Sequence, residues 1–289
     1  MLRHVNRLRS AVYGIAIGDA LGLPVQFLPR DSYPEVTEMI KGSELPWPAG
    51  TWSDDTSLTL ATVDSLLTCE GVDIPDMRAR FEDWLENGTY TPDGQVFDQG
   101  FTTVHALTQG HGCTNEQSNG NGSLMRILPL AFVQNLSDEQ IAQVSGITHA
   151  HPLSVEACQV YIHAAQLILD GFSLSEAIET ACLASETFAG LVDIGQCSRS
   201  EIRSTGYVKD SLEAAVWCLL TTNNFRDALV KAVNLGEDTD TIGAITGGLA
   251  GIAYGMESIP EPWMNALRKK DIIEYCLTAR WPGPNRWKE

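Results

Sequence analysis

Two short segments near opposite ends of the chain place acidic and hydroxyl side chains at the start of an expected helix. Asp238-Thr-Asp-Thr241 precedes four apolar residues between 242 and 252, whose spacing of three and four predicts one face of a helix. Thr51-Trp-Ser-Asp-Asp-Thr-Ser57 has the same composition ahead of a second helical pattern. Carboxylate and other oxygen ligands are those that hard divalent cations prefer. The two segments therefore suggest a shared cation site, provided that the fold brings them together.

Each segment also has an ordinary explanation. Asp238 could be the N-cap of its helix, and Asp240 would be stabilised in the first turn by the helix dipole. One capped helix start is common, whereas two starts with surplus acids and hydroxyls are better explained by a cation. Together they offer six oxygen ligands, enough for two metal ions with water completing the shells: Ser53, Asp54, Asp55, Asp238, Asp240 and Thr241.

Two further polar segments could bind a ligand. Gly120-Asn-Gly-Ser-Leu-Met-Arg126 is a glycine-rich loop entering a helix, and such a start presents free N–H groups to an anion. The alternative is a plain Asn-Gly turn with Ser123 as the cap. Thr148-His-Ala-His-Pro152 places two histidines at another helix start, where they could be structural or solvated. No His/Cys spacing typical of zinc and no Gly-x-Ser-x-Gly motif occurs, so a serine triad has no support.

The composition limits the class of protein that could carry these segments. The 289 residues are 44% hydrophobic, enough for a sizeable core, and the longest apolar runs fall short of the ~18–20 residues that span a bilayer. A net charge of −18 argues against general nucleic-acid binding and against an acidic membrane surface. Seven scattered cysteines and the absence of a signal-peptide pattern at the start predict reduced thiols and a cytoplasmic protein.

Helical periodicity dominates, and no convincing run of alternating strand residues occurs. Because the two acidic segments lie far apart and no linker divides the chain, we expect one compact all-α domain over residues 1–289, an orthogonal bundle of many helices. The expected helices cover residues 11–23, 55–69, 76–87, 97–108, 123–132, 137–147, 153–169, 173–188, 209–221, 225–234, 239–254 and 262–278. The remaining segments are predicted as a proline-rich loop at 28–52, a polar segment at 110–122, a functional loop at 188–207 and a coil at 281–284.

Glycines recur at every fourth position in two of these helices. Gly14, Gly18 and Gly22 form one stripe, and residues 243, 247 and 251 form the other. Glycine costs roughly 0.5–1 kcal/mol relative to alanine inside a helix, so a close backbone contact must compensate. We expect both helices to lie at the centre of the bundle, in contact with each other.

Taken together, these segments resemble the ADP-ribosylglycohydrolase family, which includes the dinitrogenase-reductase-activating and ADP-ribosylhydrolase proteins. Gly14-Ile-Ala-Ile-Gly-Asp-Ala-Leu-Gly22 looks like the family's opening helix, and Trp52-Ser-Asp-Asp-Thr56 is similar to its first metal motif. Gly120–Arg126 looks like its phosphate-side loop, and Asp238–Thr241 like its second metal motif. The resemblance covers most of the chain, and four motifs in the right order are highly specific.

The resemblance implies an all-α fold that holds two Mg²⁺ or Mn²⁺ ions. Their ligands would be Ser53, Asp54, Asp55, Asp238, Asp240 and Thr241, with Asp55 and Asp240 at the catalytic centre. The ADP-ribose pocket would be lined by Asn121, Gly122, Ser123, Met125, His149 and Tyr207. The metals would bind the distal ribose and deliver a water to its anomeric carbon. The expected partners are ADP-ribose and an ADP-ribosylated protein or small-molecule acceptor.

The resemblance implies a metal-dependent hydrolase that reverses ADP-ribosylation, with ADP-ribosylated arginine on protein as the preferred acceptor. One departure from the family pattern is Gln26, at a catalytic position where most members would have glutamate. Glutamine is neutral and cannot act as a general base, so we expect a slow enzyme or one with a weak second metal. The alternative is a non-catalytic or weakly catalytic ADP-ribose-binding or immunity-type protein. A structural relative similar to lens crystallins is disfavoured by the clustered carboxylates.

Overall fold

The computed structural model describes residues 2–42 and 47–278, and within these ranges it contains α-helices, short 3₁₀ helices and isolated β-bridges but no sheet. The predicted coil at 281–284 lies outside the described residues. The all-α prediction is confirmed. The α-helices are α1 (Val5–Gly22), α2 (Asp54–Thr68), α3 (Ile74–Asn87), α4 (Phe101–Gln109), α5 (Asp138–Ser145), α6 (Pro152–Leu169), α7 (Leu174–Leu183), α8 (Val208–Leu220), α9 (Phe225–Val233), α10 (Thr239–Tyr254), α11 (Glu261–Ala266) and α12 (Lys270–Leu277).

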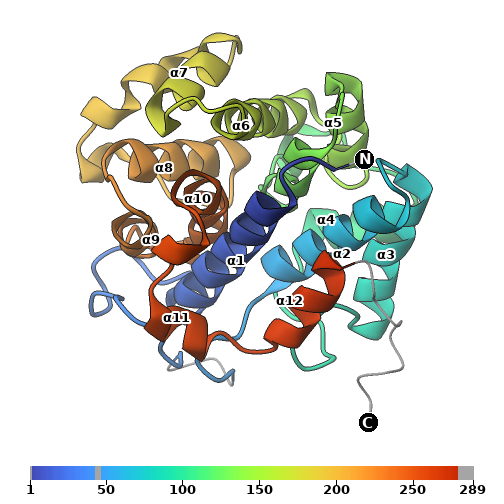
Figure 1. The fold of residues 1–289 in the computed structure, drawn as a ribbon, viewed down its shortest axis with the longest axis horizontal. Helices are drawn as coiled ribbons and strands as arrows, with labels where there is room; N and C mark the ends of the chain where they lie inside the picture. The colour runs from blue at the N-terminus through green and yellow to red at the C-terminus, as the bar shows by residue number, and fades with distance from the viewer. Residues whose placement is uncertain (1, 43–46, 279–289) are drawn as a thin grey trace.

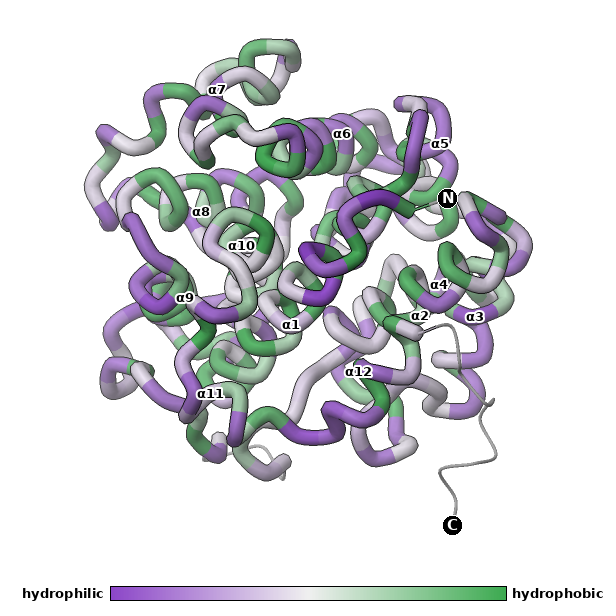
Figure 2. The backbone as a smooth tube through the Cα atoms, viewed as in Figure 1, coloured by the Kyte–Doolittle hydropathy of each residue, from purple (hydrophilic) through white to green (hydrophobic). Residues whose placement is uncertain are grey.

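The helices form an orthogonal bundle around α1 and α10 (Figure 1). In this view α6 and α7 cover one end, α8 and α9 lie beside α10, and α2, α3 and α4 lie on the opposite side of α1. Hydrophobic residues gather along α10, whereas α5 at the periphery is largely hydrophilic (Figure 2). The apolar side chains of these layers belong to one contiguous core. Within the described ranges, no helix is long and apolar enough to cross a membrane.

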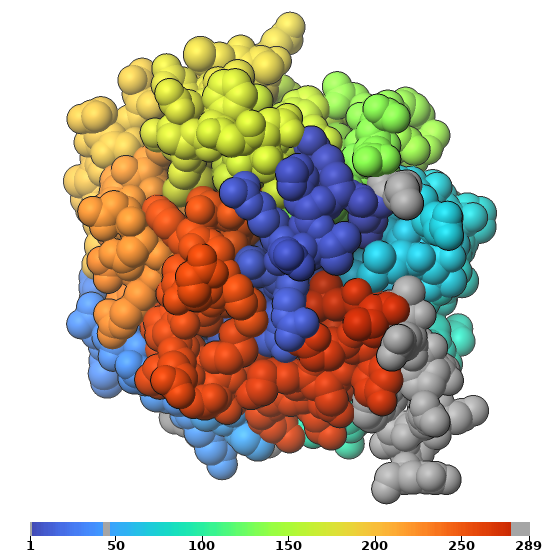
Figure 3. Space-filling model, viewed as in Figure 1, coloured from blue at the N-terminus to red at the C-terminus, as the bar shows by residue number. Residues whose placement is uncertain are grey.

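The two glycine stripes pack directly against each other, as their spacing predicts. A Cβ atom added to Gly18 would overlap the backbone carbonyl of Gly243, and one added to Gly14 would overlap that of Gly247. The same close contact continues to Gly22, which lies against Thr239 at the first turn of α10. This packing brings the start of α10 beside the end of α1. Segments from the two ends of the chain also lie side by side on the surface shown in Figure 3.

Helix α1 begins at Val5, six residues before the predicted start, and four other predicted helices differ clearly from the observed ones. Helix α4 begins at Phe101 and not at residue 97, because Asp98 adopts a left-handed conformation with φ 58° and Gly100 is the N-cap. The stretch 123–132 forms two 3₁₀ helices, Leu124–Arg126 and Leu128–Phe132, with Pro129 removing a backbone donor. The expected helix at 262–278 divides into α11 and α12 at Lys269, whose φ is 47°.

The fourth is the helix predicted at 173–188, which ends at Leu183. The predicted loop at 188–207 contains two short 3₁₀ helices, Ala189–Gln196 and Arg199–Glu201, and otherwise extended or turn conformations. Its last residues lie next to the start of α10, where the backbone N–H of Asp238 donates to the carbonyl of Ser204 at 3.0 Å. The loop therefore contributes to the surroundings of the second acidic segment.

Candidate active site

The two acidic segments meet at the N-terminal ends of α2 and α10. Ser53 is the N-cap of α2, and its hydroxyl accepts a hydrogen bond from the backbone N–H of Asp55. The Thr241 hydroxyl, in the first turn of α10, donates to Asp55 Oδ2 at 3.2 Å. The Ser53 hydroxyl donates to the same carboxylate oxygen at 3.2 Å. Oxygen atoms from both segments are thus within hydrogen-bond distance, although their positions in the sequence differ by nearly 190 residues.

The carboxylates of these segments are buried and close to one another. Burial raises the pKa of Asp54, Asp55 and Asp240 well above the ordinary value, and neighbouring carboxylates raise these pKa values further. The pKa of Asp238 is also raised by burial, although a hydrogen bond from Asn121 opposes the shift. A cluster of this kind stays ionised only when positive charge compensates the burial.

Two of these carboxylate oxygens have no protein partner. Asp55 Oδ1 and Asp240 Oδ2 are buried, and neither has a hydrogen-bond partner among the described residues. Leaving a charged group buried without partners costs roughly 1–3 kcal/mol or more. In the described part of the chain, no three His, Cys, Asp or Glu side chains form a ready-made metal cage. The two unpartnered oxygens nevertheless fit a divalent cation, because carboxylate oxygens are ligands that such cations prefer and Asp55 Oδ1 and Asp240 Oδ2 have no other partner among the described residues.

Asp19 belongs to α1 and holds the first acidic segment against that helix. It is fully buried and accepts hydrogen bonds from the backbone N–H groups of Ser53 at 2.9 Å and of Thr56 at 3.1 Å. The Thr56 hydroxyl donates to the same carboxylate. Burial raises the pKa of Asp19 to about 7, although these hydrogen bonds oppose the shift. Asp19 thus fixes the orientation of the segment that carries Asp54 and Asp55.

The glycine-rich loop lies on the other side of the same cavity. The Asn121 side-chain amide donates to Asp238 Oδ2 at 2.6 Å and to the Ser211 hydroxyl at 2.9 Å. Its backbone N–H donates to the carbonyl of Gly206 at 3.0 Å, so the loop is tied to the end of the 188–207 segment. A Cβ on Gly122 would lie 2.8 Å from Cε1 of His149, which explains why glycine is required there.

His149 is held neutral in this cavity. Burial and the neighbouring Arg126 guanidinium lower the pKa of His149 to about 3. Its Nδ1 atom lies 2.9 Å from the Thr148 hydroxyl, which also accepts a hydrogen bond from Arg126 at 2.8 Å. A neutral imidazole can hydrogen-bond to a ligand but cannot provide positive charge near pH 7.

The cavity has a volume of about 300 Å³ and contains most of the predicted site residues. Its lining includes Gln26, Asp54, Asn121, Gly122, Met125, His149, Asp238 and Thr241. The predicted residues Ser53, Asp55 and Asp240 are not part of the lining and are buried next to the lining residues Asp54 and Thr241. Ser123 is not part of the lining either, because its hydroxyl is buried against Ser145 Oγ at 2.9 Å and Cys158. Tyr207 lies just outside the cavity. It follows Gly206, which is part of the lining, and it forms an isolated β-bridge with Gly120.

Asp98 is a cavity residue that the sequence analysis missed. Its Oδ2 atom accepts a hydrogen bond from the Gln26 amide at 2.7 Å, and both residues line the cavity beside Asp54. Its negative charge contributes to the raised pKa values of Asp54 and Asp240. Asp98 lies in no recognisable motif. The only local signal is its place in a glycine-containing segment just before α4.

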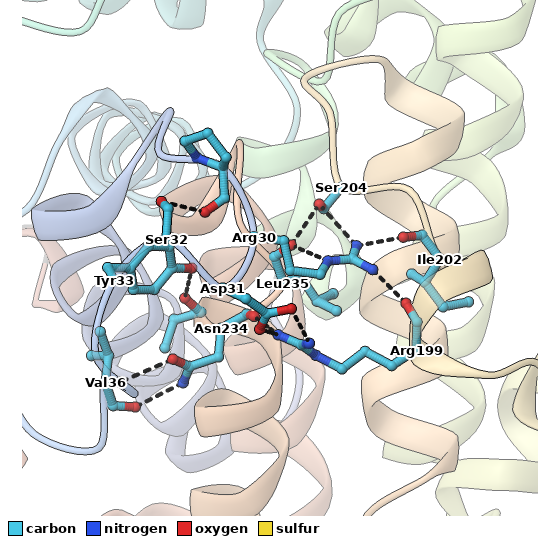
Figure 4. Close-up of polar contacts among 12 residues, drawn as sticks. Arg30, Asp31, Ser32, Tyr33, Val36, Arg199, Ile202, Ser204, Asn234 and Leu235 are labelled. Atoms are coloured by element: carbon cyan, nitrogen blue, oxygen red, sulfur yellow. Dashed lines mark hydrogen bonds and ion pairs between the residues drawn. The ribbon is translucent and has the colours of Figure 1, made fainter.

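Arg30 holds together three segments next to the second acidic segment (Figure 4). Its guanidinium donates to the backbone carbonyls of Leu235 at 2.6 Å, of Arg199 at 2.5 Å and of Ile202 at 2.5 Å. Leu235 lies three residues before Asp238, whose N–H is bonded to Ser204. Arg30 therefore helps to fix the backbone that carries Asp238.

The chain matches known proteins along nearly its whole length. Residues 2–283 match the ADP-ribosylglycohydrolase family. The chain is 34% identical over 283 residues to the ADP-ribosylarginine hydrolase Tri1 of Serratia proteamaculans (strain 568), covering 93% of this chain and 77% of that protein. It is 29% identical over 280 residues to the ADP-ribosyl-(dinitrogen reductase) glycohydrolase of Rhodospirillum rubrum, covering 92% and 91% of the two chains. A solved structure described as an ADP-ribosylglycohydrolase-related protein complex has a TM-score of 0.79 at 30% identity, covering 96% and 97%.

Proposed function

The chain belongs to the ADP-ribosylglycohydrolase family, and we propose that it is a metal-dependent hydrolase that releases ADP-ribose from ADP-ribosylated arginine on proteins. One observation carries the proposal: the cavity that the glycine-rich loop lines also contains Asp54, Asp238 and Thr241, and the Thr241 hydroxyl donates to Asp55, one of the two residues with a buried, unpartnered carboxylate oxygen. The similarity to an ADP-ribosylarginine hydrolase supports arginine as the acceptor.

Two divalent cations, Mg²⁺ or Mn²⁺, fit the proposed site. The residues that would hold them are Ser53, Asp54, Asp55, Asp238, Asp240 and Thr241. When bound, the cations would supply the Lewis acid that orients the ribose hydroxyls and activates a water molecule. They would also offset part of the negative charge of the site and so strengthen the binding of an anionic pyrophosphate to a chain with a net charge of −18.

The remaining residues orient the cavity and the ligand. Asn121 holds the Asp238 carboxylate through its amide, and Asp19 holds the backbone of Ser53. The backbone of the glycine-rich loop faces the cavity at Gly120 and Gly122, where free N–H groups can bind phosphate oxygens. His149, which is neutral, can donate or accept one hydrogen bond there.

We assign proton transfer to Asp98. Gln26 cannot accept a proton, and Glu237, another acid near the site, is exposed and does not line the cavity. Asp98 lines the cavity and is outside the set of six proposed metal ligands. A general base contributes about 10²–10⁴ in rate. The Gln26 amide, which donates to Asp98 Oδ2 at 2.7 Å, fixes the orientation of this carboxylate.

A weakly catalytic ADP-ribose-binding protein of the immunity type is the second candidate. The observation that favours it is Gln26, which places a neutral amide where an acid is expected and uses it to bind Asp98. Both candidates bind ADP-ribose in the same cavity. They differ in the rate of turnover.

Release of free ADP-ribose tests the proposal directly. ADP-ribosylarginine, ADP-ribosylserine peptide and nucleobase-linked ADP-ribose are each incubated with the protein in Mg²⁺, in Mn²⁺ and in EDTA. We expect metal-dependent release from the arginine-linked substrate. Binding of ADP-ribose without release from any of the three would favour the second candidate, and neither binding nor release would contradict both.

A further inference from the structure

Two phenylalanine side chains are exposed at the rim of the candidate active site. Phe101 is 83% exposed and Phe27 is 69% exposed, the highest values for large hydrophobic residues in the described ranges. Both belong to the lining of the cavity that contains Asp54 and Asp98. Exposed aromatic rings that line a cavity together are typical of a surface that a ligand covers.

The backbone keeps Phe27 at this position despite an unfavourable conformation. Its φ is 62°, in the left-handed region that bulky residues rarely adopt. Its N–H donates to the carbonyl of Glu237 at 2.6 Å, and the N–H of Glu237 donates back to Leu28 at 2.8 Å. This pair of hydrogen bonds fixes Phe27 next to the start of α10. This conformation turns the apolar ring outward. A relaxed backbone would orient the ring differently.

Both rings belong to the acidic end of the cavity. Phe27 follows Gln26, whose amide is bonded to Asp98, and Phe101 begins α4 three residues after Asp98. The Phe101 ring is stacked on His105, with centroids 5.8 Å apart and an interplanar angle of 11°. This stacking leaves one face of the ring free to contact a ligand. The glycine-rich loop is bonded to the 188–207 segment at Gly206 and Tyr207, and its Gly122 lies against Thr103 in the first turn of α4.

The charge at this end favours a cation. The described residues that line the cavity include Asp54, Asp98 and Asp238 but neither lysine nor arginine, and their histidine is held neutral. Asp98 is not among the proposed metal ligands, and its Oδ2 atom accepts from Gln26; its proposed role in proton transfer places this carboxylate beside the leaving group. A guanidinium is planar and weakly hydrated, stacks on aromatic faces and binds carboxylates through two donors. An aromatic rim beside a carboxylate is suited to that group.

We propose that Phe27 and Phe101, together with Asp98, form the subsite for the guanidinium of the acceptor arginine. This inference rests on the proposed function, because it assigns the acceptor side of the same cavity. The rings contact the cationic leaving group, and the glycine-rich loop contacts the nucleotide. The subsite makes the enzyme selective for arginine-linked over serine-linked ADP-ribose.

Binding measurements test the subsite apart from turnover. The affinities of ADP-ribosylarginine and ADP-ribose are compared by calorimetry in EDTA for the wild type, Phe27→Leu, Phe101→Leu and the double variant. Leucine keeps apolar area but lacks the ring quadrupole. The double variant should bind ADP-ribosylarginine about 5- to 30-fold more weakly, with little change for ADP-ribose. The Phe101→Tyr variant should bind ADP-ribosylarginine as tightly as the wild type does, because tyrosine also presents an aromatic face.

A matched control separates the rim from a general surface effect. Phe172, 48% exposed in the turn between α6 and α7, is not part of the cavity lining, and Phe172→Leu should change neither affinity. An equal loss of affinity for both ligands in the double variant, or no loss at all, would overturn the subsite. With Mg²⁺ or Mn²⁺, the KM for ADP-ribosylarginine should rise in the double variant and the KM for ADP-ribosylserine peptide should not.

The failure of the subsite is distinguishable from the failure of the proposed function. A wild type that releases ADP-ribose from arginine, with variants that keep its affinities, contradicts the subsite alone. A wild type that acts on the serine linkage and not on arginine also contradicts the subsite but leaves ADP-ribose release intact. A wild type that releases ADP-ribose from no linkage contradicts both.

Discussion

Two cavities of this molecule are lined by acidic and amide side chains, and they differ in how those groups are partnered. The cavity beside Asp31, Tyr33 and Arg199 has a volume of about 600 Å³, and the cavity beside Asp54 and Asp98 has about 300 Å³. Large cavities are the usual first choice for a binding site. The comparison shows why the smaller one is the better candidate here.

Charges around the larger cavity are matched by the protein itself. Arg199 binds the Asp31 carboxylate at 2.8 Å and the carbonyl of Asn234 at 2.6 Å. The Asn234 side chain pairs with both backbone groups of Val36, at 2.8 Å to its N–H and 2.9 Å to its carbonyl (Figure 4). Lys231 donates to Thr221 and lies over the Trp217 ring. These contacts join loops, and they leave little charge for a ligand to satisfy.

The acidic cluster next to the smaller cavity has the opposite property; the lining residues Asp54 and Thr241 are the chain neighbours of Asp55 and Asp240. Asp55 and Asp240 each keep one buried oxygen without a partner in the described ranges, and the nearby charges are acidic. Such a cluster lowers the stability of the folded protein, and a bound cation would offset that loss. Unsatisfied charge, and not cavity volume, is therefore what identifies the site.

The largest expected effect comes from removing one of the unpartnered carboxylates. Asp240→Asn should reduce turnover by at least about a thousandfold, because metal-assisted catalysis is worth several kcal/mol. The variant should remain folded, since asparagine keeps the shape and removes a repulsive charge. Turnover and circular dichroism are the measurements. Asp31→Asn, in the larger cavity, is the control and should keep turnover within a fewfold of the wild type.

The next effect concerns stability and the contacts of Arg30. Arg30→Met should lower the free energy of unfolding by about 3 kcal/mol, because several backbone carbonyls lose their donor. Chemical denaturation measures this difference. Arg203→Met, which removes an exposed partner of Asp210, should cost less than about 1 kcal/mol. If both variants unfold alike, the guanidinium of Arg30 does not hold these segments together.

A smaller effect is the pH dependence of the metal-free protein. The folded-state pKa of Asp240 is raised by burial, so between its unfolded value near 4 and its folded value the folded state binds more protons. Its contribution to stability is therefore present at low pH and is lost as the pH rises. In EDTA, the stability of Asp240→Asn relative to wild type should increase as the pH rises above about 4. Melting curves at several pH values measure this difference, and a constant difference would contradict the raised pKa.

Gln26→Glu should have the smallest effect. It replaces the amide that donates to Asp98 with a carboxylate, which loses the hydrogen bond and adds a negative charge beside the proposed cations. Metal affinity should tighten by about tenfold or less, or turnover should rise. Gln26→Met is the matched control, since it removes the hydrogen bond without adding charge. A Gln26→Glu variant that binds metal no better and is no faster than wild type would remove Gln26 from the catalytic position.

The sequence predicted the parts of the molecule that depend on local patterns. The glycine stripes of α1 and α10 could be recognised because a four-residue spacing has one structural consequence, a close helix contact. The acidic segments could be recognised because both combine carboxylates with helix starts. Of the predicted cavity residues, Asn121, Gly122, Met125 and His149 line it, whereas Ser123 packs into the core.

Individual side-chain contacts between residues far apart in the sequence could not be predicted, even where one partner, such as Gln26, was recognised. Asp98 and Gln26 are separated by 72 positions, and no local pattern links them. Arg30 lies in a proline-rich loop, and its acceptors follow it by at least 169 positions. The break at Lys269 depends on a left-handed residue that the helical periodicity of 262–278 did not reveal. Each of these features arises from tertiary contacts and not from local propensity.

The central claim is that the unpartnered carboxylates at α2 and α10 hold cations. Calorimetric titration of Mn²⁺ into the metal-free protein tests it most directly. We predict two ions per wild-type chain, loss of at least one in Asp55→Asn and in Asp240→Asn, and unchanged binding in Asp31→Asn. A wild type that binds no Mn²⁺, or variants at Asp55 and Asp240 that bind it as the wild type does, would contradict the account.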